Sequence, residues 1–200
     1  MTYREMRDLI RSDRDRLVHA MAMPRGLFGR MFVYTMPSIV ALRLYRWSRW
    51  VYGTRFRKLA WPIWSLNVYV TGADIPPTTQ IGPGCYLGHA VGCAINGKIG
   101  RNALIFGGAV VGGGRGRGDV GGGDGMPVIG DGVVMGHGAH ILGPITIGDN
   151  VTVGAMSLVL DDVPSGSVVV GVPARVVKTR AETIDYEAIA SERLERMERS

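Results

Sequence analysis

Cysteine is scarce in this 200-residue chain, which contains only Cys85 and Cys93. Two cysteines without paired spacing exclude a disulfide framework and a cysteine zinc site, and we expect both to be reduced core residues. Membrane-spanning runs are also absent, because the uncharged run Met31–Leu42 has 12 residues and a bilayer needs roughly 20. The first residues lack the apolar core of a signal peptide, so we expect a cytoplasmic protein.

Acidic residues are scarce in the first third of the chain. Residues 1–72 hold 13 Lys/Arg and 4 Asp/Glu, whereas residues 73–200 hold 10 and 13. A local basic excess is typical of segments that meet an anionic membrane, an acidic polymer or nucleic acid. No nucleic-acid-binding motif accompanies the charge, so we expect no nucleic acid partner.

What the chain does contain is a six-residue period from Ile75 to Val159. Apolar residues recur at every sixth position except Arg117 and Gly123, and a glycine often follows them. A period of six fits neither an amphipathic helix nor an alternating strand, and it predicts a solenoid whose apolar side chains point inward. After Ile75 the inward positions are Ile81, Leu87, Cys93, Ile99, Ile105, Val111, Ile129, Met135, Ile141, Ile147, Val153 and Val159.

The period divides the chain into three parts. We expect an N-terminal basic and aromatic helical segment over residues 1–72 and a mainly β domain over residues 73–178. A short charged helix is expected over residues 179–200. The glycine-rich run 112–127 interrupts the repeat, which resumes in phase at Ile129, so this run is expected to be a loop that protrudes from one coil.

The N-terminal segment has two interpretations. Its apolar spacing predicts helices over residues 3–22 and 37–51, the second opened by Pro37, followed by an apolar stretch over residues 59–70. In one interpretation these helices pack on each other and on the first coils of the solenoid. In the other, residues 27–70 make a peripheral contact with an anionic membrane at its inner face through Trp47, Trp50, Trp61 and Trp64.

Three motifs resemble the hexapeptide-repeat acyltransferases, in particular the serine O-acetyltransferase-like branch. They are Gly72–Gly92, Ile141–Gly148 and Gly171–Val177, and the resemblance covers roughly residues 38–178. It implies a left-handed parallel β-helix, a homotrimer, acetyl-CoA as co-substrate and no metal.

The resemblance also implies roles for particular residues. Asp74 and His89, 15 positions apart, match a catalytic pair in which His89 is the general base and Asp74 fixes the imidazole tautomer. Backbone N–H groups near Gly112 and Gly113 are the candidates for stabilising the oxyanion. The family's CoA-contact positions are occupied by Gly112, Gly113, His137, Ala155, Arg175 and Lys178. Arg115, Arg117 and Asp119 in the loop are candidate acceptor contacts.

Two departures from the serine enzymes bear on the acceptor. Gly88 stands where those enzymes have an Asp that binds the substrate amine, and Gly125-Met126-Pro127 replaces Arg-His-Pro. We therefore expect acetyl transfer to a hydroxyl of a sugar, as in the small enzymes that modify polysaccharide or glycoconjugate precursors, with serine O-acetylation as the alternative. Two alternatives are not acetyltransferases: a trimeric zinc protein of the carbonic anhydrase type, using His137 and His140, and a non-catalytic scaffold.

Overall fold

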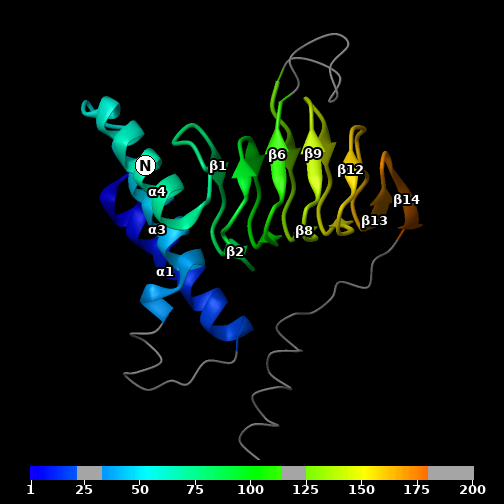
Figure 1. Cartoon of the computed structure of the whole chain (residues 1–200), viewed down its shortest axis with the longest axis horizontal. Helices are drawn as coiled ribbons and strands as arrows, with labels where there is room; N and C mark the ends of the chain where they lie inside the picture. Colours follow the sequence, from blue (N-terminus) through cyan, green and yellow to red (C-terminus); the bar gives the residue numbers. More distant parts are fainter. Residues whose placement is uncertain (22–32, 114–124, 180–200) are drawn as a thin grey trace, which may run out of the picture.

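The computed structural model describes residues 1–21, 33–113 and 125–179. Helices gather at one end of the molecule, and coils of short strands extend from them in a single stack (Figure 1). The helical elements are α1 (Tyr3–Ala20), α3 (Pro37–Tyr52), the 3-10 helix η1 (Arg57–Leu59) and α4 (Ala60–Thr71).

The stack is a parallel β-helix with three flat sides. Each side is one sheet, with strand order β1-β4-β7-β10, β2-β5-β8-β11-β13-β14 or β3-β6-β9-β12. All pairs are parallel except β13–β14, an antiparallel hairpin at the far end of the stack (Figure 1). The strands are β1 Gln80–Ile81, β2 Tyr86–Leu87, β3 Ala94–Ile95, β4 Lys98–Ile99, β5 Leu104–Ile105, β6 Val110–Gly112, β7 Val128–Ile129, β8 Val134–Met135, β9 His140–Leu142, β10 Thr146–Ile147, β11 Thr152–Val153, β12 Leu158–Val159, β13 Ser167–Gly171 and β14 Ala174–Thr179.

The predicted inward positions form the core of this β-helix. Every described residue of the six-residue phase is buried, from Ile75 at 0% exposure to Ile81 at 6%. One strand departs from the six-residue period: β3 ends at Ile95, whereas the period predicts its inward residue at Cys93. The turn before β3 is two residues longer than expected and the turn after it two residues shorter, so the phase returns at Ile99.

The predicted reduced thiols are confirmed. Cys85 and Cys93 are both free and buried. Burial in the apolar interior raises the pKa of the Cys85 thiol to about 12, because the thiolate would lose its hydration there. Cys85 is therefore a core residue without nucleophilic character at neutral pH.

The predicted helices begin where local chemistry favours a start. Thr2 and Glu5 form a reciprocal capping box at the start of α1, and Pro37 occupies the first position of α3. α4 ends at Gly72, whose φ of 72° lies in the left-handed region that glycine adopts without strain. No helix of the described residues is long and apolar enough to cross a membrane. The helix predicted over residues 179–200 lies outside the described residues except for Thr179, which ends β14.

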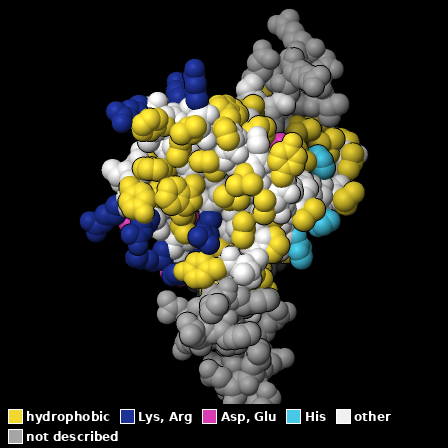
Figure 2. All heavy atoms as spheres, turned by 60° about the vertical axis from the view of Figure 1, so that its left-hand side comes forward, with side chains coloured by type: hydrophobic (Ala, Val, Ile, Leu, Met, Phe, Trp, Pro, Cys, Tyr) yellow, Lys and Arg dark blue, Asp and Glu magenta, His cyan; other side chains and the backbone are white. Residues whose placement is uncertain are grey.

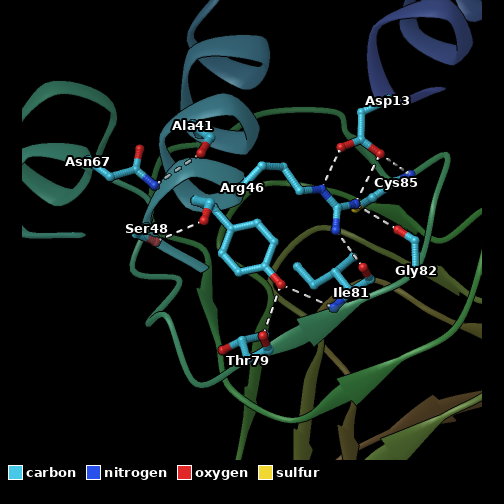
Figure 3. A network of polar contacts seen from close by, with 10 residues as sticks. Asp13, Ala41, Arg46, Ser48, Asn67, Thr79, Ile81, Gly82 and Cys85 are labelled. Atoms are coloured by element: carbon cyan, nitrogen blue, oxygen red, sulfur yellow. Dashed lines mark hydrogen bonds and ion pairs between the residues drawn. The ribbon is translucent and has the colours of Figure 1, made fainter. Parts of the chain in front are cut away.

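A buried ion pair joins the helices to the β-helix (Figure 3). Arg46 of α3 donates to the Asp13 carboxylate of α1 at 2.9 Å, and each side chain is at most 2% exposed. The guanidinium also donates to the carbonyl oxygens of Ile81 and Gly82, and the Cys85 N–H donates to Asp13. Packing of the helices on the first coils, one of the two interpretations of this segment, is therefore confirmed for α1 and α3.

Replacing Arg46 with leucine should destabilise the protein strongly. The Asp13 carboxylate would remain buried without its partner, which costs about 3–5 kcal/mol. We expect that loss in the free energy of unfolding measured by urea denaturation. The matched control is Arg101→Leu, which breaks the exposed pair with Asp131 and should cost at most about 1 kcal/mol. Equal losses in the two variants would contradict a structural role for the buried pair.

Candidate functional site

His89 lies on an enlarged turn of the β-helix. The turn Gly88–Cys93 between β2 and β3 has six residues, whereas the equivalent turn between β5 and β6 has four. The His89 side chain is exposed at this corner, and its carbonyl oxygen accepts a weak bond from the Cys93 thiol. His137 is exposed at the equivalent position of an ordinary four-residue turn, so the outward position belongs to this place on the corner and does not require the two extra residues.

His137 lies on the same corner, two coils further along. Gly107 occupies the coil between them: a Cβ placed there would lie 3.0 Å from His89 Cβ and 3.2 Å from His137 Cε1. Glycine at position 107 therefore leaves the space into which both histidines fit. A larger residue would displace one or both imidazoles, so the two rings share one small region of the surface.

Asp74 lies one coil before His89, beside the end of the enlarged turn. Its N–H donates to the Cys93 carbonyl at 2.8 Å, and its carbonyl accepts from Ile95. The 15-residue spacing thus places Asp74 and His89 on adjacent coils. Among the described residues no hydrogen bond joins their side chains, and the role of the pair stays a prediction.

Trp64 is a contact of Asp74 that sequence patterns did not reveal. The indole Nε1–H of Trp64, on α4, donates to Asp74 Oδ1 at 2.8 Å. This bond fixes one carboxylate oxygen and leaves the other available to orient an imidazole. It also makes the helical segment part of the candidate site. The apolar stretch around Trp64 gave no signal of this role, because tryptophans in such stretches usually pack as hydrophobic side chains.

Several predicted CoA-contact residues lie in a line along the stack. His137 and Ala155 are exposed on successive coils of the corner that carries His89, and the Met156 N–H donates to the His137 carbonyl at 2.8 Å. Arg175 and Lys178 are exposed on β14 at the far end. β14 is five strands from β2 in its sheet, about 24 Å at strand spacing. The corner is therefore an elongated strip with Arg175 and Lys178 at its far end, where Arg175 lies 3.6 Å from the Asp161 carboxylate.

Gly112 and Gly113 lie elsewhere. Both are at the carboxyl end of β6, where the chain leaves the β-helix and Gly125 returns beside Gly113. His89 precedes the amino end of β3 in the same sheet, so the width of one sheet, about 10 Å, separates the two positions. The predicted acceptor residues Arg115, Arg117 and Asp119 lie outside the described residues.

Phe106 fills the space next to Gly88. A Cβ at position 88 would lie 2.6 Å from Phe106 Cδ1, closer than any relaxed carbon contact. The Phe106 ring therefore occupies the space that an aspartate side chain at position 88 would need. The wall of the candidate site beside His89 is apolar here.

The histidines do not form a metal site within the described chain. Among residues 1–21, 33–113 and 125–179, no three His, Cys, Asp or Glu side chains are close enough to hold a metal ion. His140 lies on β9, and its Nδ1 is 2.8 Å from the Gly138 carbonyl.

Sequence comparison identifies relatives of this chain. Residues 126–161 match the protein family described as bacterial transferase hexapeptide (six repeats). The chain is 35% identical over 164 residues to a serine acetyltransferase of Synechococcus elongatus, covering 81% of this chain and 66% of the relative, just under two thirds of its length. It is 36% identical over 144 residues to a serine acetyltransferase of Helicobacter pylori, covering 70% of this chain and 81% of the relative.

Solved structures agree with the sequence comparison. A Neisseria gonorrhoeae serine acetyltransferase in complex with serine superposes with a TM-score of 0.76 at 31% identity, covering 88% of this chain and 70% of that one. A Brucella abortus serine acetyltransferase in complex with coenzyme A gives 0.76 at 29% identity, with coverages of 90% and 70%. The predicted left-handed β-helix is confirmed.

Trp64→Phe should slow any reaction that relies on Asp74. The variant keeps an aromatic ring and removes the N–H, so the carboxylate loses a charge-assisted hydrogen bond. We expect kcat to fall about tenfold, with KM and melting temperature unchanged. The control is Trp47→Phe, whose indole packs on Tyr3 and Trp50. An unchanged kcat in Trp64→Phe, or an equal fall in both variants, would show that the indole N–H does not position Asp74.

Proposed function

Because the chain belongs to the hexapeptide-repeat acyltransferases of the serine acetyltransferase type, we propose that it transfers the acetyl group of acetyl-CoA to a hydroxyl group, with L-serine as the first candidate acceptor. The observation that carries this proposal is the exposed His89 on its enlarged turn, with Asp74 on the adjacent coil. Two similar proteins of known structure hold serine and coenzyme A.

L-serine is now preferred over a sugar as the acceptor, whereas the sequence motifs alone favoured the sugar. Gly88 and Met126 favoured a sugar hydroxyl over L-serine, whereas the curated relatives named above are serine acetyltransferases. None of those relatives supports polysaccharide modification. L-serine is therefore the better supported acceptor.

The proposed reaction needs one base and an oxyanion site. His89 removes the proton from the acceptor hydroxyl while the oxygen attacks the thioester carbonyl. Asp74, held by Trp64, orients the imidazole and stabilises the imidazolium that forms. The tetrahedral intermediate then collapses, the C–S bond breaks, and the proton on His89 passes to the CoA sulfur. The negative oxygen of the intermediate is stabilised by N–H groups at Gly112 and Gly113.

A homotrimer would complete this site. His89 and Gly112 lie about a sheet's width apart in one chain, so they reach the same acetyl group only if neighbouring protomers contribute one each. The strip from His137 and Ala155 to Arg175 and Lys178 would hold CoA, its phosphates near the basic end. We place this enzyme in the cytoplasm, where acetyl-CoA is available.

A sugar hydroxyl remains the second candidate because of Gly88 and Phe106. An amino acid acceptor carries an ammonium group, but position 88, where a carboxylate would pair with it, is glycine, and the Phe106 ring occupies the adjoining space. Sugars present apolar faces that pack on aromatic rings, and their neutral hydroxyls need no carboxylate partner. This contact is the specific observation that favours an uncharged acceptor.

The direct test is CoA release from acetyl-CoA by the purified protein. L-serine is offered in one reaction and a panel of free sugars and nucleotide sugars in others. We expect turnover with L-serine that disappears in His89→Ala while coenzyme A binding persists. Turnover with a sugar and none with L-serine would show that the acceptor is a sugar. Unchanged turnover in His89→Ala would show that His89 is not the general base.

The double variant Gly88→Asp/Phe106→Ala should improve the use of L-serine. Phe106→Ala opens the space, and the new carboxylate can then pair with the substrate amine, a charge-assisted contact that lowers KM about tenfold. Gly88→Asp alone should not achieve this, since the Phe106 ring occupies the required volume. Phe106→Ala alone is the control. A double variant no better than this control would show that position 88 does not face the amine.

A further inference from the structure

Helix α4 buries polar side chains and exposes apolar ones, the reverse of the usual arrangement in a surface helix. Its buried residues include Asn67 and Thr71, at 0% and 4% exposure, whereas Leu66, Tyr69 and Val70 are 51%, 89% and 60% exposed. Asn67 donates to the Ala41 carbonyl of α3, and Thr71 donates back to Asn67. These bonds fix the polar side toward the protein, so the apolar side is held outward.

The outward residues form a continuous surface. Pro62, Leu66, Tyr69 and Val70 follow the i, i+4, i+7, i+8 spacing of one helix face. Phe56, Leu59 and Trp61 extend it, at 53%, 58% and 42% exposure. We call these seven residues the α4 face. Figure 2 shows hydrophobic side chains spread over this end of the molecule. Contiguous apolar surface of this kind marks a site of contact with a protein or a membrane.

Positive charge predominates beside the α4 face. Arg55, Arg57 and Lys58, directly before α4, are all exposed. Residues 16–73 contain nine Lys/Arg and no Asp or Glu. In Figure 2 the Lys and Arg side chains lie at the border of the hydrophobic area, with hardly any acidic side chain in view.

We propose that the α4 face lies on an anionic lipid surface. A second copy of the same face would bring like charges together at Arg55, Arg57 and Lys58, which disfavours self-association. Phospholipid headgroups supply the missing negative charge, and the acyl region below them accepts the apolar residues. Trp61 and Tyr69 suit the boundary between the two, because each combines an apolar ring with a polar group.

The dimensions of α4 fit a helix parallel to the membrane plane. Its 12 residues span about 18 Å, well short of the roughly 30 Å hydrocarbon layer. Trp64, on the same helix, bonds to Asp74, so a bound membrane would lie on the helix that supports the candidate site. This inference does not depend on the proposed acetyl transfer.

The test is sedimentation of the full chain with vesicles. One set contains phosphatidylcholine with 30 mol% phosphatidylglycerol, the other phosphatidylcholine alone. We expect binding to the anionic vesicles, little to the neutral ones, and loss of binding in 1 M NaCl. The triple variant Arg55→Gln/Arg57→Gln/Lys58→Gln should bind about a hundredfold more weakly, about fivefold for each charge.

The apolar half of the proposal has its own variant and control. Tyr69→Ser/Val70→Ser should weaken vesicle binding at least about tenfold. Val176→Ser/Val177→Ser, on the exposed β14 at the other end of the stack, should leave it unchanged. Circular dichroism and thermal unfolding confirm that each variant is folded. No vesicle binding by the unaltered protein would overturn the proposal. So would a Tyr69→Ser/Val70→Ser variant that changes only the mass of the assembly, because the face would then be a contact between copies.

Discussion

The close stacking of bare backbone at the corners is the constraint on which the rest of the structure depends. A Cβ at Gly100 would lie 2.5 Å from the Gly130 carbonyl oxygen, and one at Gly130 would lie 2.8 Å from Gly148 C. Glycine at these corners lets neighbouring coils approach to strand-pairing distance. The in-register ladders then fix every side chain relative to the coil before and after it.

The candidate site lies on this rigid scaffold. His89 is exposed on the Gly88–Cys93 turn, which is two residues longer than the equivalent turn between β5 and β6. Gly107 then leaves room for His89 and His137 on either side of it. A reactive group on a local exception to a rigid scaffold is held in place without being buried. The enzyme activity proposed for this chain needs an accessible base of that kind.

The helical segment is more than a cover for the first coil. Arg46 docks it through a buried ion pair and two backbone carbonyls. α4 then reaches the site through the bond from Trp64 to Asp74. The same helix turns its apolar side outward, so one element connects the site to the surface on which we propose a lipid contact. Loss of the Arg46 contacts would therefore affect both.

Much of the fold and part of the site could be predicted from the sequence. A six-residue period places each apolar residue by local geometry, so the buried positions were predictable from Ile81 to Val159, with a local shift at Cys93 and Ile95. The resemblance to the serine O-acetyltransferase-like branch singled out Asp74 and His89, which the structure places on adjacent coils. The starts of α1 and α3 followed from the capping box and Pro37.

Other features required the tertiary structure, because they arise between segments with no common period. The bond from Trp64 to Asp74, the Phe106 ring beside Gly88 and the burial of Asn67 all depend on which surfaces meet. The outward apolar side of α4 depends on those contacts as well. The sequence by itself determined the repeat and the apolar residues that stack inside it, because these follow from a local period. Only the tertiary packing of the helices decided how the Asp74 carboxylate is held and that the α4 face is exposed. Likewise, only the packing of Phe106 at the corner decided how much room an acceptor has beside His89.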